Sequence, residues 1–142
     1  MKQLLFIITF ALTVILTPQL KAQCNKTAKE LEQLSLMDTT KFKAYAMKHG
    51  IDFDNRNEDF LEFHCGNYKS TKFIIKYTTP KWFQYEFVDT AQYFSIYKQL
   101  RDRGYNIIAE DLGQTYASKT LSFEIIATDG GFYEIMIRKR EK

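Results

Sequence analysis

Apolar residues recur at helical spacing in two stretches of the chain. In the second stretch, the stripe at positions i, i+3, i+4 and i+7 consists of Tyr93, Ile96, Tyr97 and Leu100. Asp89 precedes it and can accept hydrogen bonds from the free N–H groups of the first turn, while Gly104 can adopt the left-handed conformation that ends a helix. A capping box at Thr27 opens the first stretch. The pattern predicts one helix between Asp89 and Gly104 and two shorter helices over about 27–37 and 39–49.

Alternation of apolar and polar residues marks the strands. The apolar positions of five strands are Leu61, Phe63 and Cys65; Phe73, Ile75 and Tyr77; Phe83, Tyr85 and Phe87; Leu121, Phe123, Ile125 and Ala127; and Tyr133, Ile135 and Ile137. Turn residues at 79–81 and 129–131 divide the last four strands into two hairpins. Shorter strands are expected near 51–53 and 105–109. Because successive strand residues point to opposite faces, each strand should bury one face.

The order of these signals recurs after about 50 residues. The segment that begins at Phe73 aligns without a gap to the segment that begins at Phe123. Other matched positions are Asp38 and Asp89, Gly50 and Gly104, and Trp82 and Phe132. We interpret the chain as two related units, about 38–88 and 89–139, each with a helix followed by antiparallel strands.

The first 22 residues have the features of a secretory signal peptide. A positive start at Lys2 precedes an uncharged run of 13 residues from Leu4 to Leu16, and the small residue Ala22 stands at the expected cleavage position. The run is too short to cross a bilayer, which takes about 20 residues. We expect removal of residues 1–22 and a periplasmic or secreted chain that starts at Gln23. The end of this segment resembles signals of Bacteroidota.

Helices and antiparallel strands in separate stretches are typical of α+β proteins. We therefore expect residues 23–142 to form a single two-layer helix/sheet domain, built from two tandem helix-plus-antiparallel-hairpin units. Over about 38–139 this exported tandem arrangement resembles, as topology, the β-lactamase inhibitor protein architecture and other small exported α/β repeat domains that bind proteins. The resemblance implies a protein-binding sheet face and transfers no functional residue.

The mature chain contains two cysteines, Cys24 and Cys65. An even pair in an exported chain favours a disulfide, because extracytoplasmic compartments are oxidising. The loop would hold about 40 residues, which the chain-entropy model values at on the order of 3–4 kcal/mol. One alternative is two unpaired thiols, with Cys65 as a small buried hydrophobe. Another is lipidation of Cys24, which would attach the protein to a membrane, although the preceding residues match a lipoprotein signal poorly.

Charge and motif content restrict the class of function. The formal charge of +3 falls to +1 when Lys2 and Lys21 leave with the signal peptide, and this argues against nucleic acid as a partner. A hydrophobic content of 45% excludes a wholly disordered chain. The sequence lacks zinc-ligand spacing, a nucleophile elbow, a P-loop and a dinucleotide-binding glycine pattern. We therefore expect neither an enzyme nor a bound cofactor.

Histidines and clustered carboxylates are the remaining chemistry-bearing residues. His49 is expected at a helix end, where a cation favours the helix dipole, and His64 on a strand opposite the apolar set. The acidic segment 52–59 is a candidate cation site. It departs from the EF-hand pattern, because Arg56 and Asn57 occupy positions 5 and 6 of such a loop. The simpler interpretation is a solvated loop.

The outward face of the sheet is expected to mix charged, apolar and aromatic side chains. The candidates for contact with a partner are Lys76, Trp82, Phe132 and Met136, because such mixtures are typical of protein-recognition hot spots. Two alternatives are that Trp82 packs under a loop and that a one-residue register change exchanges the faces. We expect a protein-binding module of the inhibitor, immunity or adaptor type, with a partner whose identity the sequence does not give. The alternative is a small periplasmic enzyme or ligand carrier with a pocket between helix and sheet.

Overall fold

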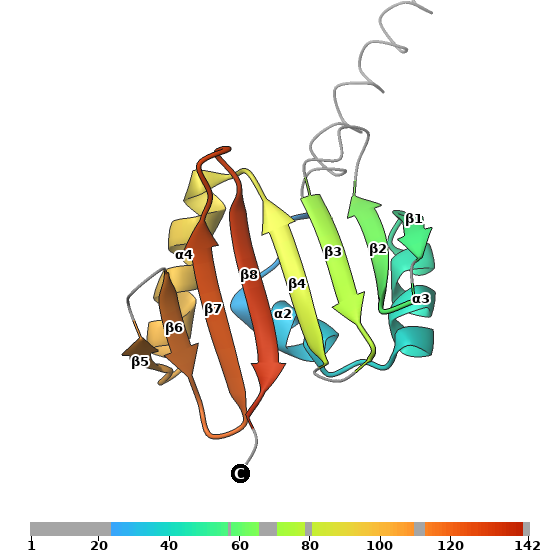
Figure 1. Ribbon diagram of the computed structural model, residues 1–142. Coiled ribbons are helices and arrows are strands. Elements are labelled where there is room, and N and C mark those ends of the chain that lie inside the picture. The colour runs from blue at the N-terminus through green and yellow to red at the C-terminus, as the bar shows by residue number, and fades with distance from the viewer. Residues whose placement is uncertain (1–23, 57, 66–70, 79–80, 110–112, 141–142) are drawn as a thin grey trace, which may run out of the picture.

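Helices cover one face of a single antiparallel sheet and leave the other face open (Figure 1). The computed structural model describes residues 24–56, 58–65, 71–78, 81–109 and 113–140. In this part of the chain the helices are α2 (Ala28–Ser35), α3 (Thr39–Lys48) and α4 (Thr90–Asp102). The protein thus has the predicted α+β, two-layer helix/sheet architecture, with the sheet as the larger layer. The predicted signal peptide, residues 1–22, lies outside the described residues.

The sheet has eight strands in the order β1-β2-β3-β4-β8-β7-β6-β5. The strands are β1 (Ile51–Arg56), β2 (Phe60–Cys65), β3 (Thr71–Lys76), β4 (Trp82–Phe87), β5 (Asn106–Ala109), β6 (Gln114–Ala117), β7 (Leu121–Ala127) and β8 (Tyr133–Lys139). Each half of the chain supplies a helix, α3 or α4, followed by four strands. The last strands of the two halves, β4 and β8, pair at the centre. The interpretation of these halves as two related units stays a prediction.

Capping side chains and glycines set the ends of the helices as the sequence predicts. Thr27 and Glu30 form the capping box of α2. The carboxylates of Asp38 and Asp89 accept hydrogen bonds from backbone N–H groups in the first turns of α3 and α4. Gly104, beyond α4, has a φ of 78°, the left-handed conformation that glycine adopts without strain. None of the described helices is long and apolar enough to span a membrane.

The core lies between the helices and the sheet. Among the alternating apolar residues of the sequence, those with exposed fractions of 3% or less include Leu61, Phe63, Cys65, Phe73, Phe83, Tyr85, Phe87, Phe123, Ile125, Ile135 and Ile137. Phe42 of α3 packs against them, with its ring centroid 5.0 Å from that of Phe63 and 5.9 Å from that of Phe73. The predicted inward face is therefore correct, and the alternative with exchanged faces is wrong.

A disulfide fastens the N-terminal segment to the sheet. It joins Cys24 to Cys65 at the end of β2, with the two Cα atoms 5.6 Å apart. The carbonyl oxygen of Cys24 also accepts a hydrogen bond from the hydroxyl of Tyr85 at 2.9 Å. The predicted pairing is present, so these two sulfurs are not free thiols. Disulfides of this kind are typical of proteins in oxidising compartments.

The acidic segment 52–59 is not the solvated loop that we expected. Most of it belongs to β1, which pairs with β2 from Ile51 to Arg56. The pairing register shifts between Phe53 and Asn55, so two residues of β1 oppose one residue of β2, as in a β-bulge. The short strand that the sequence predicts near 51–53 is therefore present, and it continues to Arg56.

Candidate functional site

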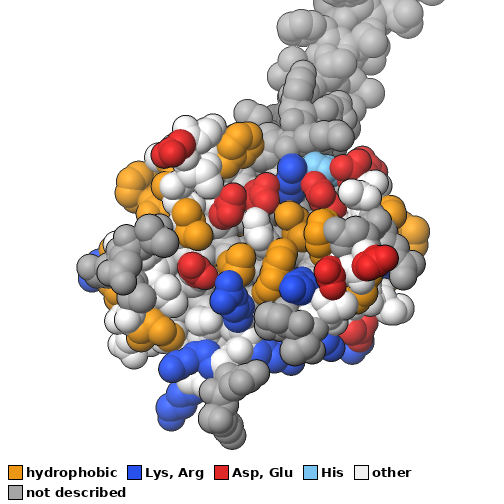
Figure 2. All heavy atoms as spheres, in the orientation of Figure 1, with side chains coloured by type: hydrophobic (Ala, Val, Ile, Leu, Met, Phe, Trp, Pro, Cys, Tyr) orange, Lys and Arg blue, Asp and Glu red, His pale blue; other side chains and the backbone are white. Residues whose placement is uncertain are grey.

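The open face of the sheet carries charged and apolar side chains in ordered rows. Strand register places the following residues on this face: Glu62 and His64 of β2; Lys72, Ile74 and Lys76 of β3; Trp82, Gln84 and Glu86 of β4; Ser122, Glu124 and Ile126 of β7; and Glu134, Met136 and Arg138 of β8. Figure 2 shows carboxylates gathered near one end of the face, apolar side chains in the middle, and lysines and arginines near the other end.

A polar network crosses the carboxylate-rich end. Residues that lie opposite one another on four adjacent strands are His64, Lys72, Glu86 and Glu134. The ammonium nitrogen of Lys72 is 3.3 Å from a carboxylate oxygen of Glu62 and 3.9 Å from one of Glu86. The amide of Gln84 donates to Glu86 at 2.8 Å and to Glu134 at 3.5 Å. Burial raises the pKa of Glu86, with the neighbouring Glu134 adding to the rise and Lys72 opposing it.

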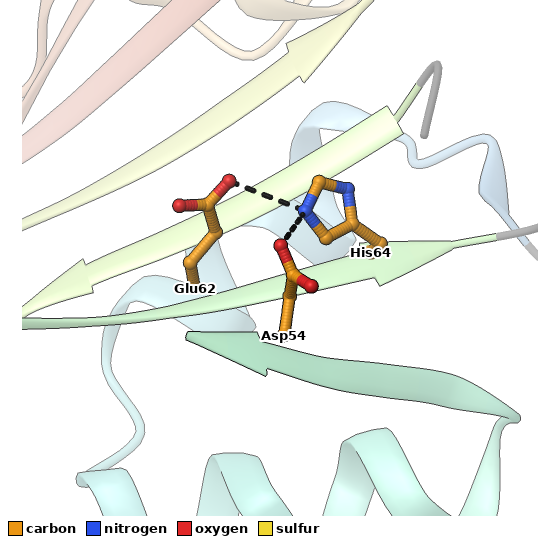
Figure 3. A group of neighbouring side chains, drawn as sticks. All are labelled: Asp54, Glu62 and His64. Atoms are coloured by element: carbon orange, nitrogen blue, oxygen red, sulfur yellow. Dashed lines mark hydrogen bonds and ion pairs between the residues drawn. The ribbon is translucent and has the colours of Figure 1, made fainter. Parts of the chain in front are cut away.

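His64 lies at the β1 side of this network, between two carboxylates (Figure 3). Its Nε2 is 2.8 Å from Asp54 Oδ2 and 3.2 Å from Glu62 Oε1. The residue is only 5% exposed, and its Nδ1 has no hydrogen-bond partner among the described residues. The strand pattern predicted His64 on the face opposite the apolar set, but it did not bring Asp54 to it. Pairing of β1 with β2 places Asp52 opposite His64, and Asp54, at the β-bulge, lies on the same face.

This group has the composition of a cation site. Asp54, Glu62 and His64 offer two carboxylate oxygens and one imidazole nitrogen, all within 4.8 Å of one another. Zinc accepts such a mixed donor set, and three protein ligands would leave a further position for water. The neighbouring Cys65 cannot act as a nucleophile beside His64, because its sulfur is in the disulfide. The arrangement can therefore hold a cation or order the face through ion pairs.

Three of the four predicted contact residues lie together, and the fourth lies apart. Lys76 and Trp82 are directly opposite each other on β3 and β4, and Met136 of β8 is opposite Gln84, two residues from Trp82 along β4. Phe132 precedes β8 and lies beyond its opposite end, because β4 and β8 are antiparallel. Six residue steps at 3.3 Å each separate the levels of Trp82 and Phe132 by about 20 Å. The prediction that Trp82 and Phe132 occupy equivalent positions on the face is therefore wrong, and the two side chains are not neighbours.

The two hairpins differ in register, which explains this error. The corresponding inward-facing pairs are Phe73 with Tyr85 in the first hairpin and Phe123 with Ile137 in the second. These residues are offset by 50 positions before the turn but by 52 positions after it. The strand counterpart of Trp82 is then Glu134. The gapless alignment is wrong beyond the turn, since two extra residues in the second turn keep the inward faces matched.

Trp82 is half-buried rather than fully exposed. Its side chain forms part of the wall of a cavity between the α2–α3 connection and the ends of the central strands. The cavity volume is about 310 Å³. Trp82 therefore borders both the open face of the sheet and the cavity at the ends of the central strands.

Comparisons with known proteins assign no family to this chain. No family model, no curated protein and no solved structure matches it.

Proposed function

We propose that this protein is an exported, non-enzymatic protein-binding module of the inhibitor, immunity or adaptor type, and that it binds its partner with the open face of the sheet. The main support is the composition of that face. Met136 lies on the middle of the face, opposite Gln84, and Trp82 lies at its cationic end, opposite Lys76. Carboxylates gather at the other end of the face (Figure 2). Aromatic and flexible apolar side chains surrounded by polar residues are typical of binding hot spots.

The charge distribution specifies the chemistry of the partner. One end of the face carries Glu62, Glu86 and Glu134 around the single ammonium group of Lys72. The other end carries cationic side chains, including that of Lys76. A folded protein with an apolar centre, basic residues on one side and acidic residues on the other would be complementary. Such complementarity increases association rates and selects one orientation.

The backbone beneath this face favours recognition through side chains. The central strands β3, β4, β8 and β7 are each paired on both sides, so their backbone N–H and C=O groups are occupied. A partner therefore cannot add a strand of its own to the sheet at the centre of the face. Side chains held on a hydrogen-bonded sheet lose little further freedom on binding, which reduces the entropic cost of association.

The disulfide supports the unlipidated, exported form within this proposal. A thioether-linked lipid would need the same sulfur of Cys24 that is bonded to Cys65. The two modifications are mutually exclusive. Mass spectrometry of the intact exported protein tests this. We expect the mass of the chain without residues 1–22, less two hydrogens for the disulfide. A diacylglycerol adduct would contradict it.

The test is affinity capture with matched surface variants. Immobilised mature protein is exposed to the extracytoplasmic fraction of its source cells, and captured proteins are identified and then titrated individually. Trp82→Ala and Met136→Glu are expected to weaken the binding of the true partner by about 2 kcal/mol or more, roughly 30-fold. Phe94→Ala is the control, because Phe94 is 62% exposed on α4, on the other layer. A partner lost equally with Phe94→Ala, or retained by both face variants, would overturn the proposal.

A further inference from the structure

The cavity beside Trp82 has an apolar interior. It opens at one end of the molecule, between the C-terminal end of α2 and the ends of β3, β4, β7 and β8. The interior surface includes Leu34, Met37, Ile75, Phe83, Leu121 and Ile137. Its volume of about 310 Å³ lies at the small end of the range for ligand sites. Such a volume suits one short alkyl chain or a single aromatic ring.

Cationic side chains surround this apolar interior. Lys76, Lys81, Arg138 and Lys139 all line the cavity. Figure 2 shows lysines and arginines gathered at this end of the molecule. Arg138 has a partner, because its guanidinium is 3.6 Å from a carboxylate oxygen of Glu124. The three lysines line the same hollow as the apolar side chains of its interior.

Among the described residues, one carboxylate lines the same cavity, and it has other partners. Asp38 accepts a hydrogen bond from the backbone N–H of Lys41 at 2.8 Å as the N-cap of α3. Its second oxygen is 3.5 Å from the ammonium group of Lys41. Among the described side chains that line the cavity, the carboxylate of Asp38 and the guanidinium of Arg138 are thus already paired, and the three lysine ammonium groups repel one another. An anion at the rim would relieve this repulsion.

We propose that this cavity binds a small amphiphilic carboxylate, with its apolar chain inside and its carboxylate group among the lysines of the rim. The apolar lining provides the affinity for the chain, and the lysines select the charge of the head group. A neutral amphiphile would lack the second contribution, and a cationic one would be repelled. This ligand site is independent of the proposed protein-binding function, although Lys76 and Trp82 border both.

Fluorescence of Trp82 provides a direct readout, because it is the single tryptophan of the chain. The mature, disulfide-bonded protein is titrated with decanoate, decan-1-ol and decylammonium, and each affinity is checked by calorimetry. We expect saturable binding of decanoate with one site, binding of decan-1-ol that is at least about tenfold weaker, and no binding of decylammonium. Added salt should weaken decanoate binding, since the rim is exposed to solvent.

Charge-reversal variants locate the head-group contact. The double variant Lys81→Glu/Lys139→Glu is expected to weaken decanoate binding at least about tenfold and to leave decan-1-ol binding unchanged. Lys29→Glu is the matched control, because Lys29 is exposed at the start of α2, away from the cavity. Equal affinities for decanoate and decan-1-ol, no saturable binding of decanoate, or wild-type affinity in the double variant would overturn the proposal.

One further variant separates this proposal from the protein-binding function. Met136 belongs to the open face but not to the cavity wall. Met136→Ala, which adds no charge beside Arg138, should therefore weaken capture of a protein partner while decanoate affinity stays unchanged. Loss of decanoate binding in this variant would place the decanoate on the open face instead, and would contradict the cavity assignment.

Discussion

The hydroxyl of Tyr85 donates a hydrogen bond to the backbone carbonyl oxygen of Cys24, a residue 61 positions earlier in the chain. The same hydroxyl oxygen accepts a hydrogen bond from the side-chain amide of Gln92 at 2.7 Å. Tyr85 is fully buried, and burial raises the pKa of its hydroxyl far above the ordinary value. The N-terminal segment, the central strand β4 and helix α4 therefore meet at one oxygen atom.

Removal of this hydroxyl should destabilise the fold. Tyr85→Phe leaves the carbonyl of Cys24 without this donor and deprives Gln92 of an acceptor inside the core. We expect the free energy of unfolding to fall by about 1–3 kcal/mol, as measured by urea denaturation. Tyr93→Phe is the control, because Tyr93 lies at the edge of the core, partly buried. Equal stability of the two variants would show that the bond between Tyr85 and Cys24 contributes nothing.

The disulfide should contribute through the unfolded state. It closes a loop between residues 41 positions apart, and the chain-entropy model gives on the order of 3–4 kcal/mol for such a loop. The double variant Cys24→Ser/Cys65→Ser is expected to lower the free energy of unfolding by about this amount. Thiol labelling of the denatured, unreduced wild-type protein should find no free cysteine. Reactive thiols at both positions in freshly isolated protein would refute the pairing.

Glu86 should make stability depend on pH in the mildly acidic range. Its pKa is raised in the folded state, so the folded protein takes up a proton at a pH where the unfolded chain has released it. Stability therefore falls as the pH rises from the ordinary value of 4.5 through the raised folded pKa. Glu86→Gln should remove this fall and raise the melting temperature at pH 7 relative to wild type.

The control for this pH effect is an exposed carboxylate outside the network. Glu58→Gln changes the same functional group at an exposed position in the turn before β2. Melting temperatures of wild type and both variants are compared from pH 4 to pH 8. If Glu86→Gln shows the same dependence of melting temperature on pH as wild type, Glu86 is not responsible for the pH effect.

Phe132 should be dispensable for partner binding. It is 41% exposed, precedes β8, and lies at the end of the sheet opposite to Trp82. Phe132→Ala is expected to leave partner affinity unchanged, whereas Trp82→Ala should weaken it by about 2 kcal/mol or more. Stability of the Phe132 variant should change by less than about 0.5 kcal/mol. An affinity loss of similar size in both variants would extend the binding surface around the turn.

Local patterns predicted most of the fold, because they report directly on burial and capping. The alternation around Phe73 and Phe123 and the N-cap residues Asp38 and Asp89 identified strands and helices correctly. The short strand β6 escaped prediction, since four residues carry little periodic signal. In β1, most side chains are polar or exposed, so its strand character depends on pairing with β2 and not on a buried stripe.

The candidate site was predicted less well, because it depends on register. Lys76 and Trp82 are neighbours through cross-strand pairing of a predicted hairpin, and that could be deduced. The contact of Asp54 with His64 depends on the pairing of β1 with β2, and the position of Phe132 depends on the length of a turn. Strand pairing and turn lengths are selected by the fit of the whole sheet, and a local window of sequence does not contain that information.

Because β4 pairs with β8 at the centre, the first strands of the two halves, β1 and β5, lie at the outer edges of the sheet. Both edge strands have an irregular register, between Phe53 and Asn55 in β1 and between Ile107 and Ala109 in β5. A regular edge strand would offer a template to which a second molecule could add a strand. The irregularities interrupt that template at each border. Edge-to-edge aggregation of this long sheet is thereby disfavoured, even though apolar side chains such as Phe53 and Ile108 are exposed there.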